Sequence, residues 1–255
     1  MTEIDAPQHA IKTVMKAFDV LQLIEKLDEP TFTDISEHSE MAESSLYNYL
    51  ITLEHIGYLT KRGDIYRLSL RFFDHGVLVR DQLQIVSHAR DILKKTAEES
   101  GSSAWISVEE HGKMVYVARE VGELPIETHA RLGKHDHMHC LAGGKAILAH
   151  LPEERVHEII DEHGLPAKTP YSITSRESLV EELEEIRKQG YATNNRERAE
   201  GAWAVAAPII VNDVVQGAIA TWQPSARIKS EEHRQKIIEL ITSASNQIEL
   251  RMTFD

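Results

Sequence analysis

The sequence predicts an α+β protein: an N-terminal winged helix-turn-helix, then a connector helix, then a mixed α/β domain with an antiparallel sheet. Two observations predict this class. Residues 31–68 read as two helices joined by a tight turn and followed by a short hairpin. Beyond residue 85, helical periodicity alternates with paired strand-like segments. The length of 255 residues suits one small and one mid-sized domain.

The first domain is predicted to span residues 10–69, after a polar tail at 1–9. Apolar residues recur at helical spacing over 10–27 and predict an amphipathic helix whose buried stripe is Val14, Phe18, Leu21 and Ile24. The helix is expected to end before Pro30, because proline disfavours helix in the residue that precedes it. A short second helix is expected at 34–39, with Thr33 as its cap.

A third helix is predicted from about residue 44 to 55, capped near Glu43 or Ser44 and ended by Gly57. Its expected buried stripe consists of Leu46, Leu50, Leu53 and Ile56. Apolar and polar residues then alternate on both sides of a Gly-Asp pair at 63–64, which tolerates the positive φ of a hairpin tip. A helix-turn-helix with such a wing is typical of proteins that place the second helix in the major groove of DNA.

Residues 70–84 are predicted as the connector helix, and 85–255 as the second domain. In that domain helices are expected at 85–100, 141–151, 152–163, 175–189 and 231–251. Strands are expected at 104–110, 113–120, 127–132, 202–211 and 214–222. This order predicts antiparallel strands with the helices on one side of the sheet.

The charge is unusual for a DNA-binding protein. The chain carries a net charge of −13, and residues 1–80 alone carry −5, whereas DNA affinity normally rests on a basic surface. An acidic surface would suit a salt-rich cytoplasm such as that of a halophilic archaeon. The single cysteine, Cys140, excludes an intrachain disulfide and fits a reducing cytoplasm. Neither a signal peptide nor a bilayer-spanning apolar run is expected, so no membrane is predicted as a partner.

The third helix and the wing carry the candidates for reading DNA. The helix face opposite its apolar stripe presents Ser44, Ser45, Tyr47 and Asn48. Asparagine can pair bidentately with adenine, and serine can donate to a phosphate or a base. Lys61 and Arg62 at the wing could hold a phosphate or enter the minor groove. The competing interpretation is that all six are solvated polar positions on a small helical bundle.

The chain resembles IclR-type transcriptional regulators over nearly its whole length. The resemblance rests on VMKAFDVLQLIEKL, ESSLYNYLITLEHIGYL and YRLSLRFFDHG in the first domain, and on MHCLAGGKAILAHLPEE and GYATNNRERAEGAWAVAAPI in the second. It implies a DNA-binding domain, a connector and an effector-binding domain in a protein that forms dimers or tetramers. It also implies control of genes for carbon-source catabolism. Glu43 and Asn48 stand where many members have Lys and Arg, so the resemblance does not indicate the operator sequence.

The resemblance also implies an effector site, formed by Met138, Ala142, Gly143, Asn194, Ala204, Ala220 and Trp222. Backbone N–H groups at the start of the helix near Gly143 would face an anion. Asn194 stands where the family usually has Asp or Ser, and Trp222 adds a large ring. These differences favour a sugar acid or an aromatic acid over a two-carbon keto acid. Alternatively, Gly143 is only a packing residue.

One cluster favours other functions. His135, His137, His139 and Cys140 could hold zinc, which would make a metal-responsive regulator. Cys140 with a neighbouring histidine as base could also make an enzyme. A buried, inert cysteine is the favoured interpretation, so neither a metal nor a cofactor is predicted.

Together these observations predict a cytoplasmic transcription regulator and not an enzyme. It is expected to bind a pseudopalindromic operator in double-stranded DNA as a homodimer or tetramer. A small-molecule effector, such as an organic or sugar acid, is expected to control its occupancy. An architectural DNA-binding protein without an effector is the remaining alternative.

Overall fold

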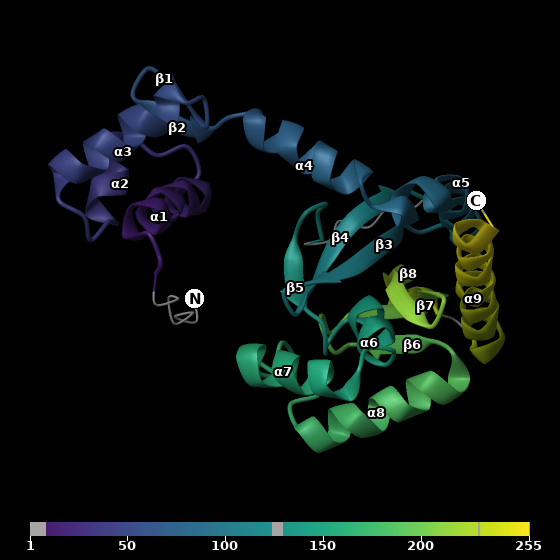
Figure 1. Cartoon of the computed structure of the whole chain (residues 1–255). Coiled ribbons are helices and arrows are strands. Elements are labelled where there is room, and N and C mark those ends of the chain that lie inside the picture. Colours follow the sequence, from purple (N-terminus) through teal and green to yellow (C-terminus); the bar gives the residue numbers. More distant parts are fainter. Residues whose placement is uncertain (1–8, 124–129, 229, 255) are drawn as a thin grey trace. The chain divides into compact units, whose positions relative to one another are not determined.

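The computed structural model describes residues 9–123, 130–228 and 230–254 (Figure 1). The chain divides into two compact units at the bond between Val79 and Arg80. The predicted polar tail at 1–9 lies outside the described residues except for His9. Among the described residues, no helix combines the length and the apolar character needed to cross a bilayer.

The N-terminal unit contains the predicted helix-turn-helix and wing. Its elements are α1 (Lys12–Leu27), α2 (Phe32–Glu37), α3 (Glu43–His55), β1 (Leu59–Arg62) and β2 (Ile65–Leu68). The two strands pair antiparallel with Arg62 opposite Ile65, so the tip falls at the predicted Gly-Asp pair. A core of Val20, Leu21, Ile24, Ile35, Leu46, Leu50, Leu53, Leu59 and Tyr66 holds the elements together.

Two predicted helix caps are wrong. The cap of α2 is Thr31 and not Thr33: the Asp34 N–H donates to the Thr31 hydroxyl, and the Asp34 carboxylate accepts from the Thr31 N–H at 2.8 Å. This reciprocal capping box fixes the start of the helix two residues earlier than expected. α3 begins after Ala42 without a side-chain cap, so neither Glu43 nor Ser44 caps it.

Three residues of the predicted apolar stripes are exposed. On α1 the buried residues are Val20, Leu21 and Ile24, whereas Val14 and Phe18 are 52% and 56% exposed. Ile56, which directly follows α3, is 44% exposed. Periodicity identifies residues that share a face, but the core of this small unit covers only part of the face. The uncovered part is an apolar surface on α1.

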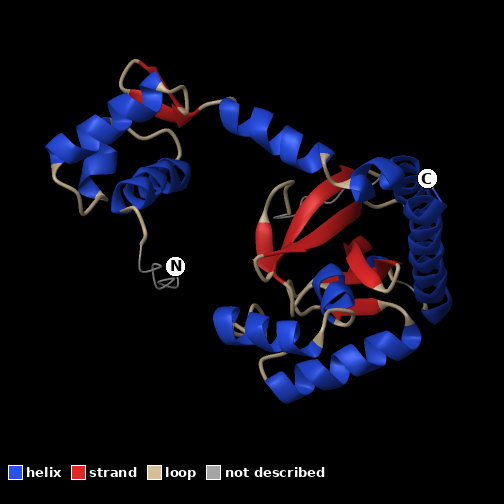
Figure 2. Ribbon diagram, in the orientation of Figure 1, coloured by secondary structure: helices blue, strands red, loops and turns tan. Residues whose placement is uncertain are grey.

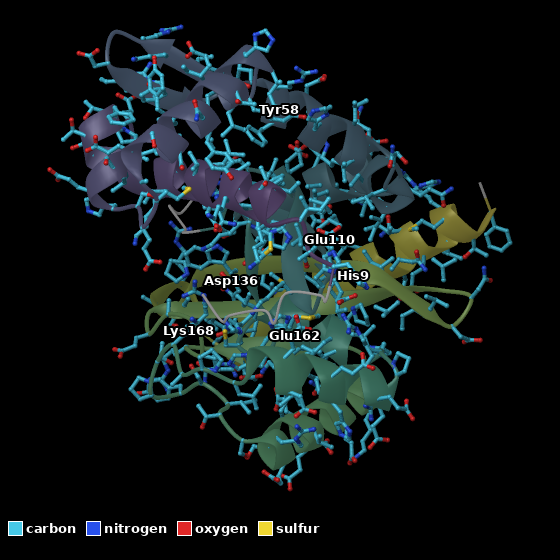
Figure 3. All side chains as sticks on the ribbon, turned by 60° about the vertical axis from the view of Figure 1, so that its left-hand side comes forward. His9, Tyr58, Glu110, Asp136, Glu162 and Lys168 are labelled. Atoms are coloured by element: carbon cyan, nitrogen blue, oxygen red, sulfur yellow. The ribbon has the colours of Figure 1, made fainter. Side chains whose placement is uncertain are left out.

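α4 (Arg71–Asp81) is the predicted connector, but it ends at Asp81, before the predicted end at residue 84, where α5 begins. Hydrogen bonds attach the first turns of α4 to the segment between α3 and β1. The Arg71 guanidinium donates to the Ile56 carbonyl at 2.6 Å, and the Tyr58 hydroxyl lies 2.9 Å from Nε2 of His75. Tyr58 is labelled in Figure 3. None of the residues of α4 is buried, and Phe73 and Leu78 are largely exposed.

The C-terminal unit is built on one antiparallel sheet, in which six strands among the described residues have the order β5-β4-β3-β8-β7-β6. These are β3 (Ala104–Glu110), β4 (Lys113–Glu120), β5 (His135–His137), β6 (Ala192–Asn195), β7 (Ala202–Val211) and β8 (Val214–Pro224). The predicted hairpins β3-β4 and β7-β8 are confirmed. β5 and β6 were not predicted, because three or four polar residues show no strand periodicity.

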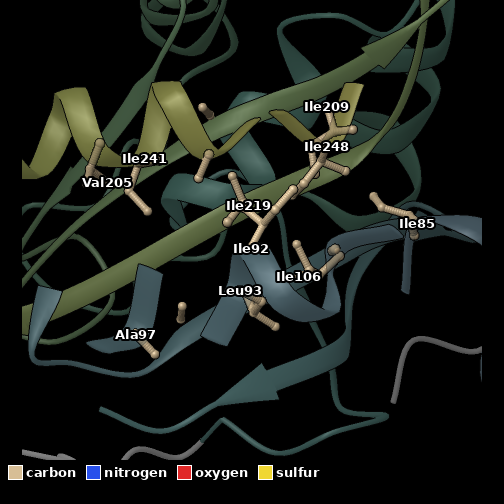
Figure 4. Close-up of a cluster of buried hydrophobic side chains, with 14 of the residues drawn as sticks. Ile85, Ile92, Leu93, Ala97, Ile106, Val205, Ile209, Ile219, Ile241 and Ile248 are labelled. Atoms are coloured by element: carbon tan, nitrogen blue, oxygen red, sulfur yellow. The ribbon is translucent and has the colours of Figure 1, made fainter. Parts of the chain in front are cut away.

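Helices cover both faces of this sheet, so the prediction that they lie on one side is wrong (Figure 2). α5 (Gln84–Ser100) and α9 (Glu231–Phe254) pack against one face, where branched aliphatic side chains form the core shown in Figure 4. α6 (Ala142–Leu148), α7 (Glu153–His163) and α8 (Arg176–Gln189) belong to the core on the other face. Both faces of the central strands are therefore buried.

The predicted strand at 127–132 lies partly outside the described residues, and Ala130, Arg131 and Leu132 are not in a strand. The predicted helix at 141–151 is shorter: α6 is preceded by Leu141 and followed by Ala149. α7, α8 and α9 lie where the periodicity predicts them. Ser175 caps α8 by accepting a hydrogen bond from the Ser178 N–H.

Candidate DNA-reading surface and ligand cavity

The four predicted DNA-reading residues of α3 lie on its exposed surface. Ser44, Ser45, Tyr47 and Asn48 are all exposed, and the Tyr47 ring packs edge-on against Phe32 with 6.3 Å between ring centres. Ser45 and Asn48 also line a groove of about 660 Å³, whose opposite wall comes from α1. The structure therefore gathers these side chains at the N-terminal half of α3, where such helices meet base edges.

The wing presents its basic residues next to the tip. Lys61 and Arg62 are exposed at the end of β1, and Gly63 adopts the positive φ of +60° that the turn needs. The Lys61 ammonium lies 4.9 Å from the centre of the Tyr66 ring. Lys61 therefore lies along the wing, and Arg62 is the residue next to the tip.

The C-terminal unit contains a cavity of about 290 Å³ between the sheet and the start of α6. Its floor is formed by three small residues of adjacent strands, Ala202, Ala204 and Ala220, which we call the alanine floor. Leu141, Ala142 and Gly143 form the opposite wall. The cavity exists because methyl groups on the sheet face a helix start that is also made of small residues.

Two glycines bring α6 close to the sheet. A Cβ on Gly143 would lie 2.9 Å from the Ser107 hydroxyl oxygen and 3.1 Å from the Met114 sulfur. A Cβ on Gly144 would overlap the backbone of Met138. Gly143 is therefore required for the close approach as well as lining the cavity. Met138 itself is buried behind α6 and does not line this cavity, unlike the other six predicted effector-site residues.

The wall on β3 and β4 supplies aromatic rings and hydroxyl groups that sequence reasoning missed. Trp105 and Tyr116 pack edge-on with 5.2 Å between ring centres. Ser107 lies directly opposite Tyr116 in the sheet. Both hydroxyls line the cavity, and neither makes a hydrogen bond with any residue that the structure describes. Burial raises the pKa of the Tyr116 phenol, which therefore remains a hydrogen-bond donor.

The polar end of the cavity contains two cations and one carboxylate. Asp136 (labelled in Figure 3) accepts a hydrogen bond from Nη2 of Arg198 at 3.1 Å, and its carboxylate lies 3.5 Å from the Lys134 ammonium. The Asp136 carboxylate also accepts from the His137 N–H at 3.2 Å. Two cationic side chains thus lie next to one carboxylate at this end of the cavity.

Asn194 lines the cavity but both ends of its amide bind the protein. Its amide nitrogen donates to the Cys140 carbonyl, and its oxygen accepts from the Glu197 N–H at 3.0 Å. Glu197 in turn accepts from the buried Lys145 ammonium of α6 at 2.8 Å, and Glu182 of α8 does the same. Desolvation raises the pKa of Glu197, although Lys145 opposes this shift. The network fixes the segment after β6, which carries Arg198, against α6.

The histidine cluster is dispersed among separate partners. Nε2 of His135 lies 3.3 Å from a Glu110 carboxylate oxygen, and Nε2 of His139 lies 3.2 Å from the Pro166 carbonyl. The Lys113 ammonium lies 3.3 Å from Nδ1 of His137. Burial, together with Lys113 as the next largest cause, lowers the pKa of His137 to about 4. Among the described residues, no three His, Cys, Asp or Glu side chains are placed to hold a metal.

Cys140 has the properties of an inert core thiol. Its side chain is buried, and burial raises its pKa to about 11. At neutral pH it is therefore a thiol, which is a weak nucleophile. Within the described part of the chain, the hydrogen bond of its Sγ runs to the His137 carbonyl oxygen at 3.8 Å and not to an imidazole nitrogen that could act as a base. The geometry gives no support to the alternative of a Cys/His enzyme.

Comparison with known proteins assigns both units to domains of one family. The family model for the IclR helix-turn-helix domain matches residues 13–63, and the model for the bacterial transcriptional regulator IclR C-terminal domain matches residues 77–250. The HTH-type transcriptional regulator KdgR of Escherichia coli is 24% identical over 99% of this chain and 97% of its own length. ArcR of Halobacterium salinarum, described as a probable HTH-type transcriptional regulator, is 27% identical over 95% and 94%.

Solved structures show the same fold. A crystal structure of the Thermotoga maritima IclR superposes with a TM-score of 0.78 and 27% identity, covering 96% of this chain and all of the other. An IclR homologue from Microbacterium hydrocarbonoxydans, solved in complex with 4-hydroxybenzoate, has a TM-score of 0.80 and 20% identity, covering 94% and 98%. These relatives are transcription regulators and not enzymes, as the sequence predicts for this chain. Because the C-terminal family model alone matches more than half of its residues, the chain belongs to the IclR family of transcriptional regulators.

Proposed function

We propose that this regulator binds a pseudopalindromic operator and that a small organic acid in the cavity controls its occupancy. The observation that carries the proposal is the cavity itself, which combines an apolar floor, aromatic walls and an end that contains Arg198. Pockets with mostly apolar walls and few polar groups are typical of small-molecule sites. A regulator without an effector would have no use for such a cavity inside its larger unit.

The relatives support an effector of this kind. The Microbacterium hydrocarbonoxydans homologue is described as complexed with 4-hydroxybenzoate, an organic acid. One curated relative, from Acinetobacter baylyi, is a p-hydroxybenzoate hydroxylase transcriptional activator. For this chain we propose Ala142, Gly143, Asn194, Ala204, Ala220 and Trp222 as wall residues. Met138 would act only by supporting α6.

We assign DNA reading to α3 and the wing. Asn48 and the serines at positions 44 and 45 would contact bases and phosphates, Tyr47 the backbone or a thymine methyl, and Lys61 and Arg62 a phosphate or the minor groove. The protein would act in the cytoplasm, where its DNA is.

The proposed assembly is a homodimer, which two-fold operators require. α1 and α4 leave several large apolar side chains uncovered, among them Val14, Phe18, Phe73 and Leu78. Patches of this kind mark interaction surfaces. A second copy is the occupant that also places two α3 helices on one DNA molecule.

The effector site is tested by a thermal-shift screen of aromatic, keto and sugar acids. A true ligand at about 100-fold its Kd should raise the Tm by roughly 5 °C or more. Ala204→Leu fills the cavity and should abolish this shift, whereas Ala167→Leu, at an exposed loop position, should preserve it. The same acid should change the affinity for DNA sites mapped in cells. If an acid shifts both variants equally, it binds outside the cavity and the proposed site is wrong.

A further inference from the structure

The hydrogen-bonding capacity of the cavity distinguishes between the ligand classes that the sequence leaves open. We propose that the effector is a single-ring aromatic carboxylic acid with one or two further polar groups, and not a polyhydroxylated sugar acid. Its carboxylate would pair with Arg198, and its remaining polar groups would bind the Ser107 and Tyr116 hydroxyls. This inference rests on the proposed effector site.

The first argument is a count of the polar groups that remain available. The Asn194 amide is used at both ends, and the Thr221 hydroxyl donates to the Ser103 carbonyl at 3.1 Å. Asp136 accepts hydrogen bonds from Arg198 and from the His137 N–H, and its carboxylate lies 3.5 Å from the Lys134 ammonium. Among the described lining residues, the Ser107 and Tyr116 hydroxyls have no partner, and neither has the buried indole N–H of Trp105. The lining side chains therefore offer few polar partners to a ligand besides Arg198.

A sugar acid presents several hydroxyl groups, and each one buried without a partner weakens binding substantially. Trp105, Trp222, Met114 and the alanine floor would face most of them with carbon atoms. An aromatic ring instead fits these walls, because rings pack favourably edge-on or offset against one another. The volume of about 290 Å³ lies at the small end of ligand pockets, which favours one ring over two.

The second argument is charge. Arg198 uses Nη2 for Asp136, and no other hydrogen bond of its guanidinium to a described residue is present. A carboxylate approaching from the cavity would meet a planar group with donors left over, which is the partner that Arg suits best. A carboxylate bound by these remaining donors would not need to displace Asp136 from Arg198.

The test is calorimetric titration of the full chain with 4-hydroxybenzoate, benzoate and D-gluconate. We expect 4-hydroxybenzoate to bind and gluconate not to bind. Tyr116→Phe and Ser107→Ala should each weaken 4-hydroxybenzoate roughly 2–10-fold and leave benzoate unchanged, because only the hydroxyl contact is lost. Arg198→Gln should weaken both aromatic acids roughly 10–100-fold.

Gluconate binding that disappears in Ala204→Leu would overturn the ligand class while the proposed effector site stands. Absence of heat with both aromatic acids would also overturn the class, and the screen with the cavity-filled variant then decides separately whether the cavity binds an effector. Equal losses for benzoate and 4-hydroxybenzoate in Tyr116→Phe would mean that the hydroxyl acts through structure and not through the ligand.

Discussion

At the scale of single residues, the two glycines of α6 differ in what they touch. Gly143 faces a hydroxyl and a thioether, both of which can move slightly, whereas Gly144 faces backbone atoms of Met138 that cannot. Gly143→Ala should therefore cost about 1–3 kcal/mol in the free energy of unfolding, and Gly144→Ala should cost more. Urea denaturation of both variants checks the order, and a reversed order would show that α6 does not approach the sheet as described.

A second residue-scale prediction concerns His137. Its pKa is lowered to about 4 in the folded protein, so the unfolded chain, with an ordinary pKa near 6.5, binds more protons between these values. Stability should therefore be fully present above pH 6.5 and decrease as the pH falls toward 4. His137→Gln should make the decrease of Tm between pH 7 and 5 shallower, whereas substitution of the more exposed His157 should not.

At the scale of elements, the wing should supply most of the favourable charge toward DNA. The unit lies within a stretch with a net charge of −5, so few phosphate contacts are expected and the salt dependence of operator affinity should be shallow. Lys61→Ala combined with Arg62→Ala should lower the slope of log K against log salt by up to about 2. Lys26→Ala on α1 serves as a control. A steep slope that the double substitution leaves unchanged would mean that phosphates are held elsewhere.

The contacts between α4 and the segment that connects α3 to the wing belong to the same scale. The Arg71 guanidinium lies 5.2 Å from the centre of the Tyr58 ring and donates to the Ile56 carbonyl, and the Tyr58 ring stacks on His75. These contacts join the end of α3, the wing and the first turns of α4 into one body. A displacement of α4 would thus be transmitted directly to α3, the helix that we propose reads DNA.

At the scale of the whole molecule, assembly should depend on the uncovered apolar residues of α1 and α4. Phe18→Glu and Phe73→Glu place charges on side chains that are 56% and 70% exposed in one copy, so the fold should survive. In analytical ultracentrifugation both variants should shift the protein toward smaller species and weaken operator binding. Glu54→Ala, exposed on α3, should leave the sedimentation unchanged. Unaltered assembly in both phenylalanine variants would place the dimer contact elsewhere.

The order of elements could be predicted because each long helix or strand shows the hydrophobic periodicity of its type. The heptad-like spacing in α5 and α8 and the hairpins β3-β4 and β7-β8 are all visible in sequence. The short strands β5 and β6 could not be predicted, since their pairing depends on neighbours that lie far away in the chain. The second helical layer was missed for a similar reason: strands buried on both faces lose their alternation.

The cavity was predicted only on the walls that carry the family motif. Six of the seven residues assigned by resemblance line it, and their binding role stays a prediction. Trp105, Ser107 and Tyr116 lie on strands whose two faces are both buried, so their sequence context is the same as that of core residues. Arg198 was within a quoted motif, but only the contact with Asp136 on another strand gives it a function.

The alanine floor has a consequence for how such a regulator diversifies. Its methyl groups take no part in the polar network that fixes Asn194 and Arg198, so the space above them can be enlarged or reduced without disturbing a hydrogen bond. Ala204→Gly or Ala220→Val would alter the size of acceptable molecule while leaving the chemistry at its charged end intact. Selectivity for ligand size and selectivity for functional groups thus depend on residues of different strands. Substitutions can change one of these selectivities during evolution while the other is retained.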